Sequence, residues 1–557
     1  MTKLKILPAL LLLVVLARCT STQPISTETD PPVTTVVDTT ATEVDTPDTA
    51  PATRPDDWFH LDPEEGYRGA GTARAYHTLL NGKEPRQTVI VAVIDSGIDI
   101  DHEDLQGHIW TNDDELAGNG TDDDQNGYVD DTHGWNFIGG RDGAHVQYDT
   151  YELTREFVKL SAKYQDVDPA DVPEDEQQAY QYYQEVRADF DQEVQNTQQQ
   201  FANVDGFLVA LKQADEILKA HLNVNAITPD VLETVDESQE MLARAKGIFT
   251  FLFDNELTIE ELEEYHESLQ VDLDYRYSTD FDPRSIVGDN YDDTSERLYG
   301  NRDVEGPDAE HGTHVAGIIA ADRNNDLGPR GIAGAAQIMV LRTVPDGDER
   351  DKDVANAIRY AVDNGAHIIN MSFGKSYSPQ KAVVDDAVRY ADNKGVLMVH
   401  ASGNDGEDLD SVPNFPTRTF LDGQQAANWL EIGATSWKGD HQFAASFSNY
   451  GKHSVDLFAP GVDIYSTLPD QAYGERDGTS MAAPVVTGVA ALIMSYYPDL
   501  TATQVRDILL QTATPYPDQE VLVPGTQDRV TPFGQLSVTG SVVNAYAALK
   551  MAEVWSH

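Results

Sequence analysis

The sequence predicts an α/β fold that is built on a mainly parallel sheet and interrupted by an all-α insertion. Continuous apolar runs, typical of buried parallel strands, occupy residues 88–94, 367–372 and 396–401. Segments with helical spacing lie between the later runs, at 353–364 and 382–393. Strands that alternate with helices imply parallel pairing through right-handed crossovers.

The chain is long and strongly acidic. Its 557 residues carry a formal net charge of -57, and nucleic-acid phosphates repel such a polyanion, which excludes a nucleic-acid partner. The length allows either one large domain with an insertion or two domains. The acidic excess is spread along the sequence, as expected for a solvated acidic surface.

Residues 1–19 have the features of an export signal: lysines near the start, an apolar run at 6–17, and Cys19 just after it. The run is shorter than the about 20 residues that span a bilayer. Cys19 is the only cysteine, so an intramolecular disulfide is impossible. Its position resembles that of the acylated cysteine in bacterial lipoprotein signals, although Arg18 replaces the small residue expected before it. We expect an exported protein, attached to the cell envelope or cell surface if Cys19 is lipidated and secreted otherwise.

Residues 20–55 are rich in Thr, Pro, Asp and Ser and show no helical or strand periodicity. This composition predicts a disordered tether that holds the body of the protein away from a membrane. The segment has too little apolar content for a folded inhibitory prodomain, so zymogen control of the usual kind is not expected.

An acidic residue, Asp95, ends the first predicted strand. Open α/β sheets place functional groups at the carboxyl ends of their strands. Asp95 is therefore a candidate functional residue, and an aspartate that only begins a turn is the alternative. Two later strands end at the same functional edge, in the residues Ser372, Phe373, Gly374, Ser402, Gly403 and Asn404.

A second acidic motif begins at residue 122. Oxygen-bearing side chains recur at alternate positions with a glycine at the sixth, as in the first half of an EF-hand-type calcium loop. The predicted calcium ligands are Asp122, Asp124, Asn126, Tyr128 through its carbonyl, and Asp130. The glutamate expected at the twelfth position is absent, so residues from elsewhere would have to complete a structural calcium site. An acidic surface turn is the alternative.

Residues 141–299 change in character to long polar helices. Apolar residues at three- and four-residue spacing run through 180–222, and Thr228 and Thr258 have the signatures of helix caps. These features predict a helical insertion of long antiparallel helices whose aromatic stripe is core. The segment carries no recognisable chemistry, and gating of substrate or docking of a partner are its candidate roles.

A helix of small residues is predicted at 308–320, with His311 at its start. The ring of His311 can project outward, whereas His314 lies three residues further on, inside the helix. Two histidines at this spacing can ligate a metal, but no further Cys, His or Glu pattern supports zinc. A general base at position 311 with a buried structural neighbour is the better explanation.

The motif Gly478-Thr479-Ser480 precedes small residues and an apolar run at 489–494. A serine on a tight turn at a helix N-terminus exposes its hydroxyl where the helix dipole favours developing negative charge. Ser480 is therefore a candidate nucleophile. Taken alone, the motif favours a simple helix cap over a nucleophile.

Together, Asp95, His311 and Ser480 supply what amide hydrolysis needs: a carboxylate, a base and a nucleophile. The segments Val-Ile-Asp95-Ser-Gly, His311-Gly-Thr-His-Val-Ala-Gly and Gly-Thr-Ser480-Met-Ala-Ala-Pro resemble the three signatures of the subtilisin-like serine peptidases, in the same chain order. Ser402-Gly403-Asn404 is similar to the oxyanion segment of that family.

This resemblance implies a three-layer α/β/α sandwich with a mainly parallel, seven-stranded sheet, formed by residues 56–140 and 300–557. It also implies a serine endopeptidase that hydrolyses proteins or peptides through an acyl-enzyme on Ser480. In the family pattern, Asn404 is the oxyanion donor beside the Ser480 backbone N–H. The residues that would bind the substrate backbone are Ser372, Phe373, Gly374, Ser402 and Gly403.

The sequence departs from the compact members of that family in the distance between its motifs. Asp95 and His311 lie 216 residues apart, and the helical insertion accounts for the excess. The insertion could convert a general protease into a restricted one. In another alternative, the protein is a catalytically silent surface protein that binds through its insertion and calcium loop. Retention of the three catalytic residues and Asn404 favours the enzyme.

Overall fold

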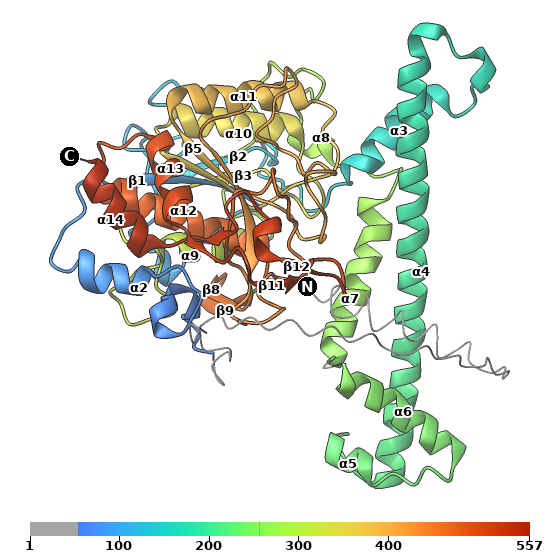
Figure 1. Cartoon of the computed structure of the whole chain (residues 1–557). Helices are drawn as coiled ribbons and strands as arrows, with labels where there is room; N and C mark the ends of the chain where they lie inside the picture. Colours follow the sequence, from blue (N-terminus) through green and yellow to red (C-terminus); the bar gives the residue numbers. More distant parts are fainter. Residues whose placement is uncertain (1–53, 256, 557) are drawn as a thin grey trace, which may run out of the picture. The chain divides into compact units, whose positions relative to one another are not determined.

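The computed structural model describes residues 54–255 and 257–556. The predicted export signal, Cys19 and nearly all of the predicted tether lie outside the described residues. The described chain forms two compact units (Figure 1), an α/β unit of residues 54–165 and 279–556 and a helical unit of residues 166–278.

The α/β unit is built on one sheet of nine strands in the order β10-β13-β7-β6-β5-β4-β1-β3-β2. All neighbours pair in parallel except β10 and β13. The strands are β1 (Val89–Asp95), β2 (Gly134–Asn136), β3 (Ala336–Arg342), β4 (Ile368–Met371), β5 (Leu397–Ala401), β6 (Trp429–Thr435), β7 (Leu457–Pro460), β10 (Thr514–Pro515) and β13 (Ser541–Val542). The seven strands from β7 to β2 form the expected parallel sheet, and the two-residue strands β13 and β10 extend it beyond β7.

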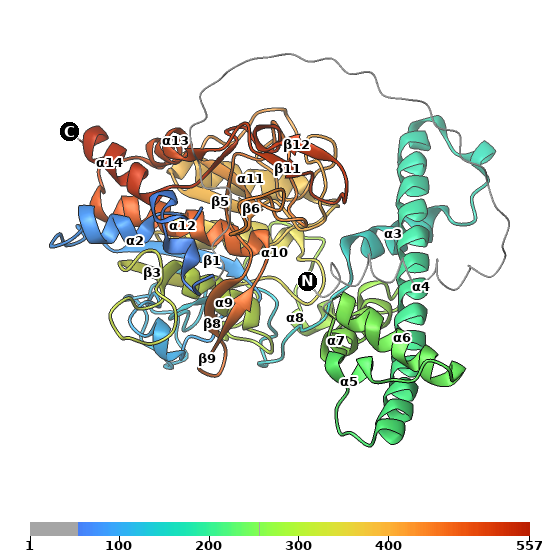
Figure 2. The same ribbon diagram turned by 60° about the horizontal axis from the view of Figure 1, so that its bottom comes forward.

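Helices cover both faces of the sheet, which makes a three-layer sandwich (Figure 1, Figure 2). One face carries α9 (Glu310–Ala320), α12 (Thr479–Tyr496), α13 (Ala502–Thr512) and α14 (Ala545–Trp555), and the other carries α10 (Asp351–Asp363) and α11 (Lys381–Lys394). Val91 and Val93 of β1 join the first core, whereas Ala92 and Ile94 join the second. Because both faces of the sheet are buried, the strands are continuous apolar runs, as the sequence predicts.

Helix α12 lies in the core of this unit. Its length and composition would allow it to span a membrane, but 89% of its apolar window is buried, as in the core helix of a globular unit. The remaining strands and α-helices of this unit form two antiparallel ribbons and three helices. They are β8 (Ile464–Leu468) with β9 (Ala472–Arg476), β11 (Glu520–Leu522) with β12 (Val530–Pro532), α2 (Thr72–Arg74), α3 (Glu152–Tyr164) and α8 (Arg284–Val287).

The helical unit is organised along α4 (Gln177–Leu222), a single helix of 46 residues. Helices α6 (Glu240–Asp254) and α7 (Ile259–Val271) pack against α4 around a core of leucine and phenylalanine side chains, and α5 (Pro229–Glu233) precedes them. Thr228 caps α5, and Thr258 forms a capping box at the start of α7, as predicted.

Two segments that flank the helices, 141–165 and 279–299, belong to the α/β unit, so the helical unit is shorter than the predicted insertion. Buried ion pairs hold both segments in place. Glu152 pairs with Lys375 at 2.7 Å, and Arg284 pairs with an aspartate of α10 at 2.5 Å. In a sequence these charges indicate solvent exposure, and only the folded chain shows that they are buried as pairs.

Candidate active site

The predicted catalytic residues gather at the carboxyl edge of the sheet. Strands β5, β4 and β1 are consecutive, and because they run in parallel their carboxyl ends lie at one edge. Asp95 is the last residue of β1, and β4 and β5 run into residues 372–374 and 402–404. Helices α9 and α12 bring His311 and Ser480 to the same edge.

His311 and Asp95 are in direct contact. His311 Nδ1 donates to Asp95 Oδ1 at 2.7 Å, and the carboxylate is buried while the imidazole side chain is 40% exposed. Helix α9 can approach β1 this closely because residue 312 is glycine, where a Cβ would lie 2.1 Å from the Gly97 carbonyl oxygen. The buried carboxylate therefore fixes the orientation of a partly exposed imidazole.

The charges around His311 raise its pKa above the ordinary value of 6.5. Burial alone lowers this pKa, but the charge and hydrogen bond of Asp95 outweigh burial, and Asp308 and Glu310 add to the rise. In contrast, burial lowers the pKa of His314 to about 3. His314 is fully buried and donates to a backbone carbonyl oxygen at 3.1 Å, so it is the neutral structural neighbour that the sequence predicts.

Ser480 lies in the first turn of α12, behind Gly478 at the N-cap. Its hydroxyl donates to the Ser372 carbonyl oxygen at 3.0 Å, and the Ser372 hydroxyl donates back to the Ser480 carbonyl oxygen at 3.0 Å. Among the described residues, no hydrogen bond joins Ser480 Oγ to His311. The structure thus brings serine and histidine to one edge, with the serine hydroxyl turned towards Ser372.

Asn404 is held in one orientation by the residue before the candidate nucleophile. Its side-chain oxygen accepts hydrogen bonds from the Thr479 backbone N–H at 2.9 Å and from the Thr479 hydroxyl at 3.0 Å. The Asn404 side-chain nitrogen has no partner among the described residues, and the residue is exposed. With its oxygen engaged, Asn404 can offer only N–H donors to a ligand. Sequence reasoning missed the role of Thr479, although its place beside Ser480 was the available signal.

Two asparagines outside the recognised motifs hold in place the segments that are predicted to bind the substrate backbone. Asn414 and Asn449 donate their side-chain N–H groups to the Ser402 carbonyl oxygen at 3.1 and 2.9 Å. Gly374 lies so close to Asn414 that a Cβ at position 374 would be 2.3 Å from the Asn414 side-chain oxygen. Both segments are therefore rigidly placed beside each other.

A cavity of about 230 Å³ opens beside Asp95 and His311. Asp308, Asp346 and Phe373 also line it, so a substrate side chain could enter between the Asp–His pair and the segment 372–374. Its rim carries more carboxylates than cations, which favours an uncharged or basic side chain.

In the acidic loop, only one of the predicted calcium ligands lies in a cluster of three carboxylates. Asp124 meets Glu115 and Asp131, and an oxygen of each lies within 4.8 Å of the others. Asp130 instead accepts one hydrogen bond from the side chain of Arg302, at 2.6 Å. Asp130 has a φ of +55°, and this turn of the backbone separates its carboxylate from that of the next residue.

Two of the other predicted calcium ligands have partners within the loop. Asp122 accepts the backbone N–H groups of Asn126 and Gly127, and the Asn126 amide donates to Asp124 at 2.9 Å. The predicted ligand atom of Tyr128 is its carbonyl oxygen, and its hydroxyl donates to the distant Arg297 carbonyl oxygen. Loop spacing does not include Glu115 and Asp131, because Glu115 precedes the recognised spacing and Asp131 falls outside its alternation.

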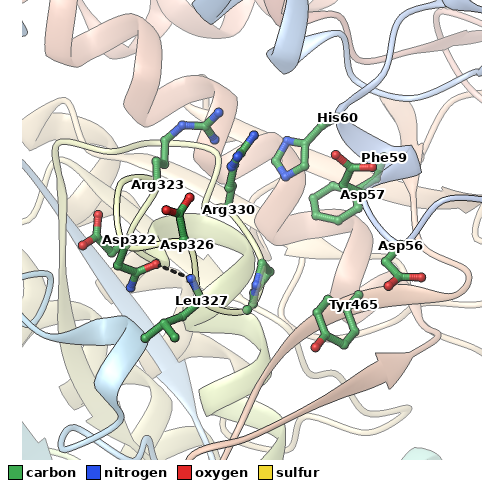
Figure 3. Close-up of a pocket in the computed structure, with 13 residues that line it drawn as sticks. Asp56, Asp57, Phe59, His60, Asp322, Arg323, Asp326, Leu327, Arg330 and Tyr465 are labelled. Carbon is green, nitrogen blue, oxygen red and sulfur yellow. Dashed lines mark hydrogen bonds between the residues drawn. The ribbon is translucent and has the colours of Figure 1, made fainter.

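A larger cavity, of about 420 Å³, contains none of the predicted site residues. Arg323 and Asp326, from the loop that follows α9, line it together with His60 and Tyr465 (Figure 3). The guanidinium of Arg323 lies over the ring of Tyr76 at 3.8 Å. Burial lowers the pKa of His60 well below its usual range, so that ring is neutral. Charges of both signs line this cavity, which gives it no clear ligand preference.

A parallel α/β sandwich with an Asp–His pair and a serine-bearing helix N-terminus at its carboxyl edge defines the class of the protein, a serine-type hydrolase. Residues 86–531 match the peptidase S8 model, described as the subtilase family, and the chain belongs to this family of serine endopeptidases.

Several proteins are similar to the chain. Subtilisin BL of Lederbergia lenta is 40% identical over 205 residues, which are 37% of this chain and 70% of that protein. M-protease of Shouchella clausii (strain KSM-K16) is also 40% identical over 205 residues, covering 37% of this chain and 50% of that protein. A crystal structure of a cold adapted subtilisin-like serine proteinase is 28% identical, with a TM-score of 0.35, and the match covers 44% of this chain and 78% of that one.

Proposed function

We propose that the protein is an exported serine endopeptidase that hydrolyses peptide bonds in proteins or peptides with Asp95, His311 and Ser480. The observation that carries this proposal is the 2.7 Å hydrogen bond from His311 to the buried Asp95 carboxylate. Such a contact sets the tautomer of a catalytic imidazole and stabilises its cation. Membership of the subtilase family supports the same chemistry.

The reaction begins when Ser480 Oγ attacks the carbonyl carbon of the scissile peptide. His311 takes the hydroxyl proton at Nε2 and gives it to the leaving amine, and water then hydrolyses the acyl-enzyme with His311 as the base. For the first step, the Ser480 hydroxyl must leave the Ser372 carbonyl oxygen and rotate towards His311. Hydrogen bonds between catalytic groups commonly tighten only when substrate binds.

Asn404 supplies a donor for the negative charge that develops on the substrate oxygen. Its side-chain oxygen is already engaged by Thr479, so the amide nitrogen is the end left to face a ligand. The Ser480 backbone N–H, at the start of α12, would be the second donor, where the helix dipole also favours an anion. Donors held in place before reaction stabilise a transition state without the cost of reorganisation.

The substrate would bind as an added strand along residues 372–374. Ser402 and Gly403 would contact the substrate backbone from the opposite side, near the bond that is cleaved. Main-chain hydrogen bonds give such binding its affinity, and side-chain pockets give it selectivity. The cavity beside His311 and Asp308 is the candidate pocket.

We also propose a structural calcium ion at Glu115, Asp124 and Asp131. Carboxylate oxygens are hard ligands that suit this ion, and these three lie within 4.8 Å of one another. Burial, together with repulsion by Asp124, raises the pKa of Asp131 although three hydrogen bonds oppose the rise. A divalent cation would remove that repulsion and brace the loop.

Two further proposals concern the parts of the chain outside the catalytic machinery. An exported chain would either carry a lipid on Cys19 or be secreted without one, and the mass of the mature N-terminal peptide distinguishes these two forms.

The helical unit would restrict substrates or dock a partner. Removing residues 166–278 should raise turnover of casein relative to short peptides if the unit restricts access, and should leave the ratio unchanged if it does not.

The experiment that tests the proposed activity compares wild type with Ser480→Ala on casein and on short peptides. Wild type should cleave both, and the variant should fold normally but release no product. Circular dichroism of both proteins is the control for folding. Equal turnover by the two proteins would remove Ser480 from the mechanism.

A further inference from the structure

A buried hydrogen-bonded pair, His400 and Glu431, contacts the proposed substrate-binding segment without taking part in the proposed chemistry. His400 lies on β5, in register with Met371 of β4 on one side and Glu431 of β6 on the other. Its side chain is fully buried. Because β4 continues into residues 372–374, His400 lies directly beside the start of that segment.

Both nitrogens of the His400 ring face oxygen atoms. Nε2 lies 2.8 Å from the Phe373 carbonyl oxygen, and Nδ1 lies 2.8 Å from Glu431 Oε1. A carbonyl oxygen can only accept, and an ionised carboxylate can only accept. The two contacts therefore need two protons on the ring and the carboxyl group together. Whichever of these two groups holds the proton between them, His400 Nε2–H donates to the Phe373 carbonyl oxygen.

The surroundings of Glu431 keep this pair in one geometry. Glu431 Oε2 accepts the Trp429 indole N–H at 2.9 Å, and the Glu431 backbone N–H donates to Asp456 at 2.8 Å. A buried pair of polar groups is weak evidence for a role in stability. What the pair does supply is a hydrogen bond from His400 Nε2 to one particular carbonyl group.

That carbonyl group sets the direction of an exposed donor. The peptide bond between Phe373 and Gly374 is planar, so its N–H points away from its C=O. With the Phe373 oxygen directed to buried His400, the Gly374 N–H is directed to the opposite side. Gly374 is exposed, and within the described chain its N–H has no hydrogen-bond partner. It is therefore free to bind a carbonyl group of an extended peptide.

We propose that His400 is a positioning residue for substrate binding, which, together with Glu431, orients the Phe373–Gly374 peptide so that the Gly374 N–H meets the substrate backbone. This inference rests on the proposed role of residues 372–374 in binding substrate. His400 does not touch the reacting atoms, so its effect acts on extended substrates and not on the reactivity of Ser480.

The test compares two reactions of His400→Gln with those of wild type. One is kcat/KM for a peptide nitroanilide with four residues before the scissile bond, and the other is the rate constant for labelling by a small alkyl fluorophosphonate. The flexible glutamine amide cannot meet Glu431 and the Phe373 carbonyl oxygen in the geometry of the rigid imidazole, so we expect kcat/KM for the peptide to fall about tenfold, mainly through KM. Labelling should stay unchanged, because the fluorophosphonate has no peptide backbone to pair with Gly374.

Two further variants make the result specific. Glu431→Gln replaces the carboxyl group that holds His400 Nδ1 in place, so it should also raise KM for the peptide without slowing the label. His60→Gln is the matched control, since His60 is equally buried in the same unit and bonds to Thr72 at 2.5 Å, away from the catalytic edge. Both of its rates should match wild type.

The outcomes separate this inference from the proposed function. Unchanged peptide kinetics in His400→Gln, or equal losses in both reactions, would overturn the role of His400. A wild-type protein that the fluorophosphonate does not label would instead overturn the proposed catalytic function. If His400→Gln does not fold, a ¹⁵N spectrum of the wild-type histidines still decides, because a His400 ring without a proton on Nε2 contradicts the proposal.

Discussion

The catalytic edge and the acidic loop differ in how residues of one motif come together. Asp95 and His311 are 216 residues apart in the sequence, yet they form a 2.7 Å hydrogen bond. Asp124 and Asp130 lie in one short loop, yet Asp130 binds Arg302 whereas Asp124 faces Glu115 and Asp131. Position in the sheet therefore predicts which residues meet at a site better than their separation in the sequence does.

The physical reason is the regularity of a parallel sheet. β1 pairs with β3 and β4 residue by residue, so the end of each strand is placed at the same edge. In the loop, the direction of each side chain depends on individual backbone angles, such as the φ of +55° at Asp130. Variants of the two regions test this difference.

The largest effect is expected for Asp95→Asn. An asparagine side chain can donate to His311 Nδ1, which would favour the tautomer that cannot accept the Ser480 proton. We expect kcat to fall about 10⁴-fold while the protein stays folded. Peptide kinetics with a thermal unfolding control measure this, and a loss below tenfold would show that the Asp95–His311 contact is not catalytic.

Asn404→Ala should have the next largest effect. Loss of one oxyanion donor typically costs about 10²–10³ in kcat, with little change in KM. Thr479→Val should show a smaller loss, because the hydroxyl supplies only one of the two hydrogen bonds that orient Asn404. Steady-state kinetics of both variants provide the check. A Thr479→Val enzyme slower than Asn404→Ala would mean that Asn404 is not the donor.

The calcium proposal predicts a different response from two adjacent aspartates. Asp131→Asn should lose calcium binding in calorimetric titration of the chelated protein, whereas Asp130→Asn should retain it. At 100 times its Kd, a bound ion adds about 2.7 kcal/mol to the free energy of unfolding, so only Asp130→Asn should still gain stability from calcium. Loss of binding in Asp130→Asn, with binding retained in Asp131→Asn, would instead favour the ligand set expected from loop spacing.

The smallest effect is expected in the pH profile. Only neutral His311 accepts the serine proton, so kcat/KM falls as the pH drops through the pKa of His311. The raised pKa places this fall above pH 6.5. Asp308→Asn removes a negative charge, lowers the pKa, and should move the fall to lower pH by less than about one unit. A profile that moves to higher pH would contradict this electrostatic account.

The regular parts of this molecule are predictable from sequence because local physics determines them. The apolar run before Asp95, the small-residue helices, and the caps at Thr228 and Thr258 all depend on neighbours within a few residues. The same holds for the candidate edge, since the ends of parallel strands must meet there.

The remaining features depend on contacts between distant residues. Because Glu152 is charged, the sequence predicts that it lies at the surface. In the fold it is buried against Lys375, and this contact keeps its segment in the α/β unit. Glu115 completes the acidic cluster from outside the loop spacing. His400 stands in an apolar strand with no motif around it, and its partners Phe373 and Glu431 come from other parts of the chain.

The central claim is that Ser480 is the nucleophile activated at this edge, and fluorophosphonate labelling followed by peptide mapping tests it most directly. We predict one label per chain, on the peptide that contains Ser480, and no label on Ser480→Ala. Asp95→Asn should label far more slowly at the same residue. A label on any other residue, or equal labelling of Ser480→Ala, would contradict the account.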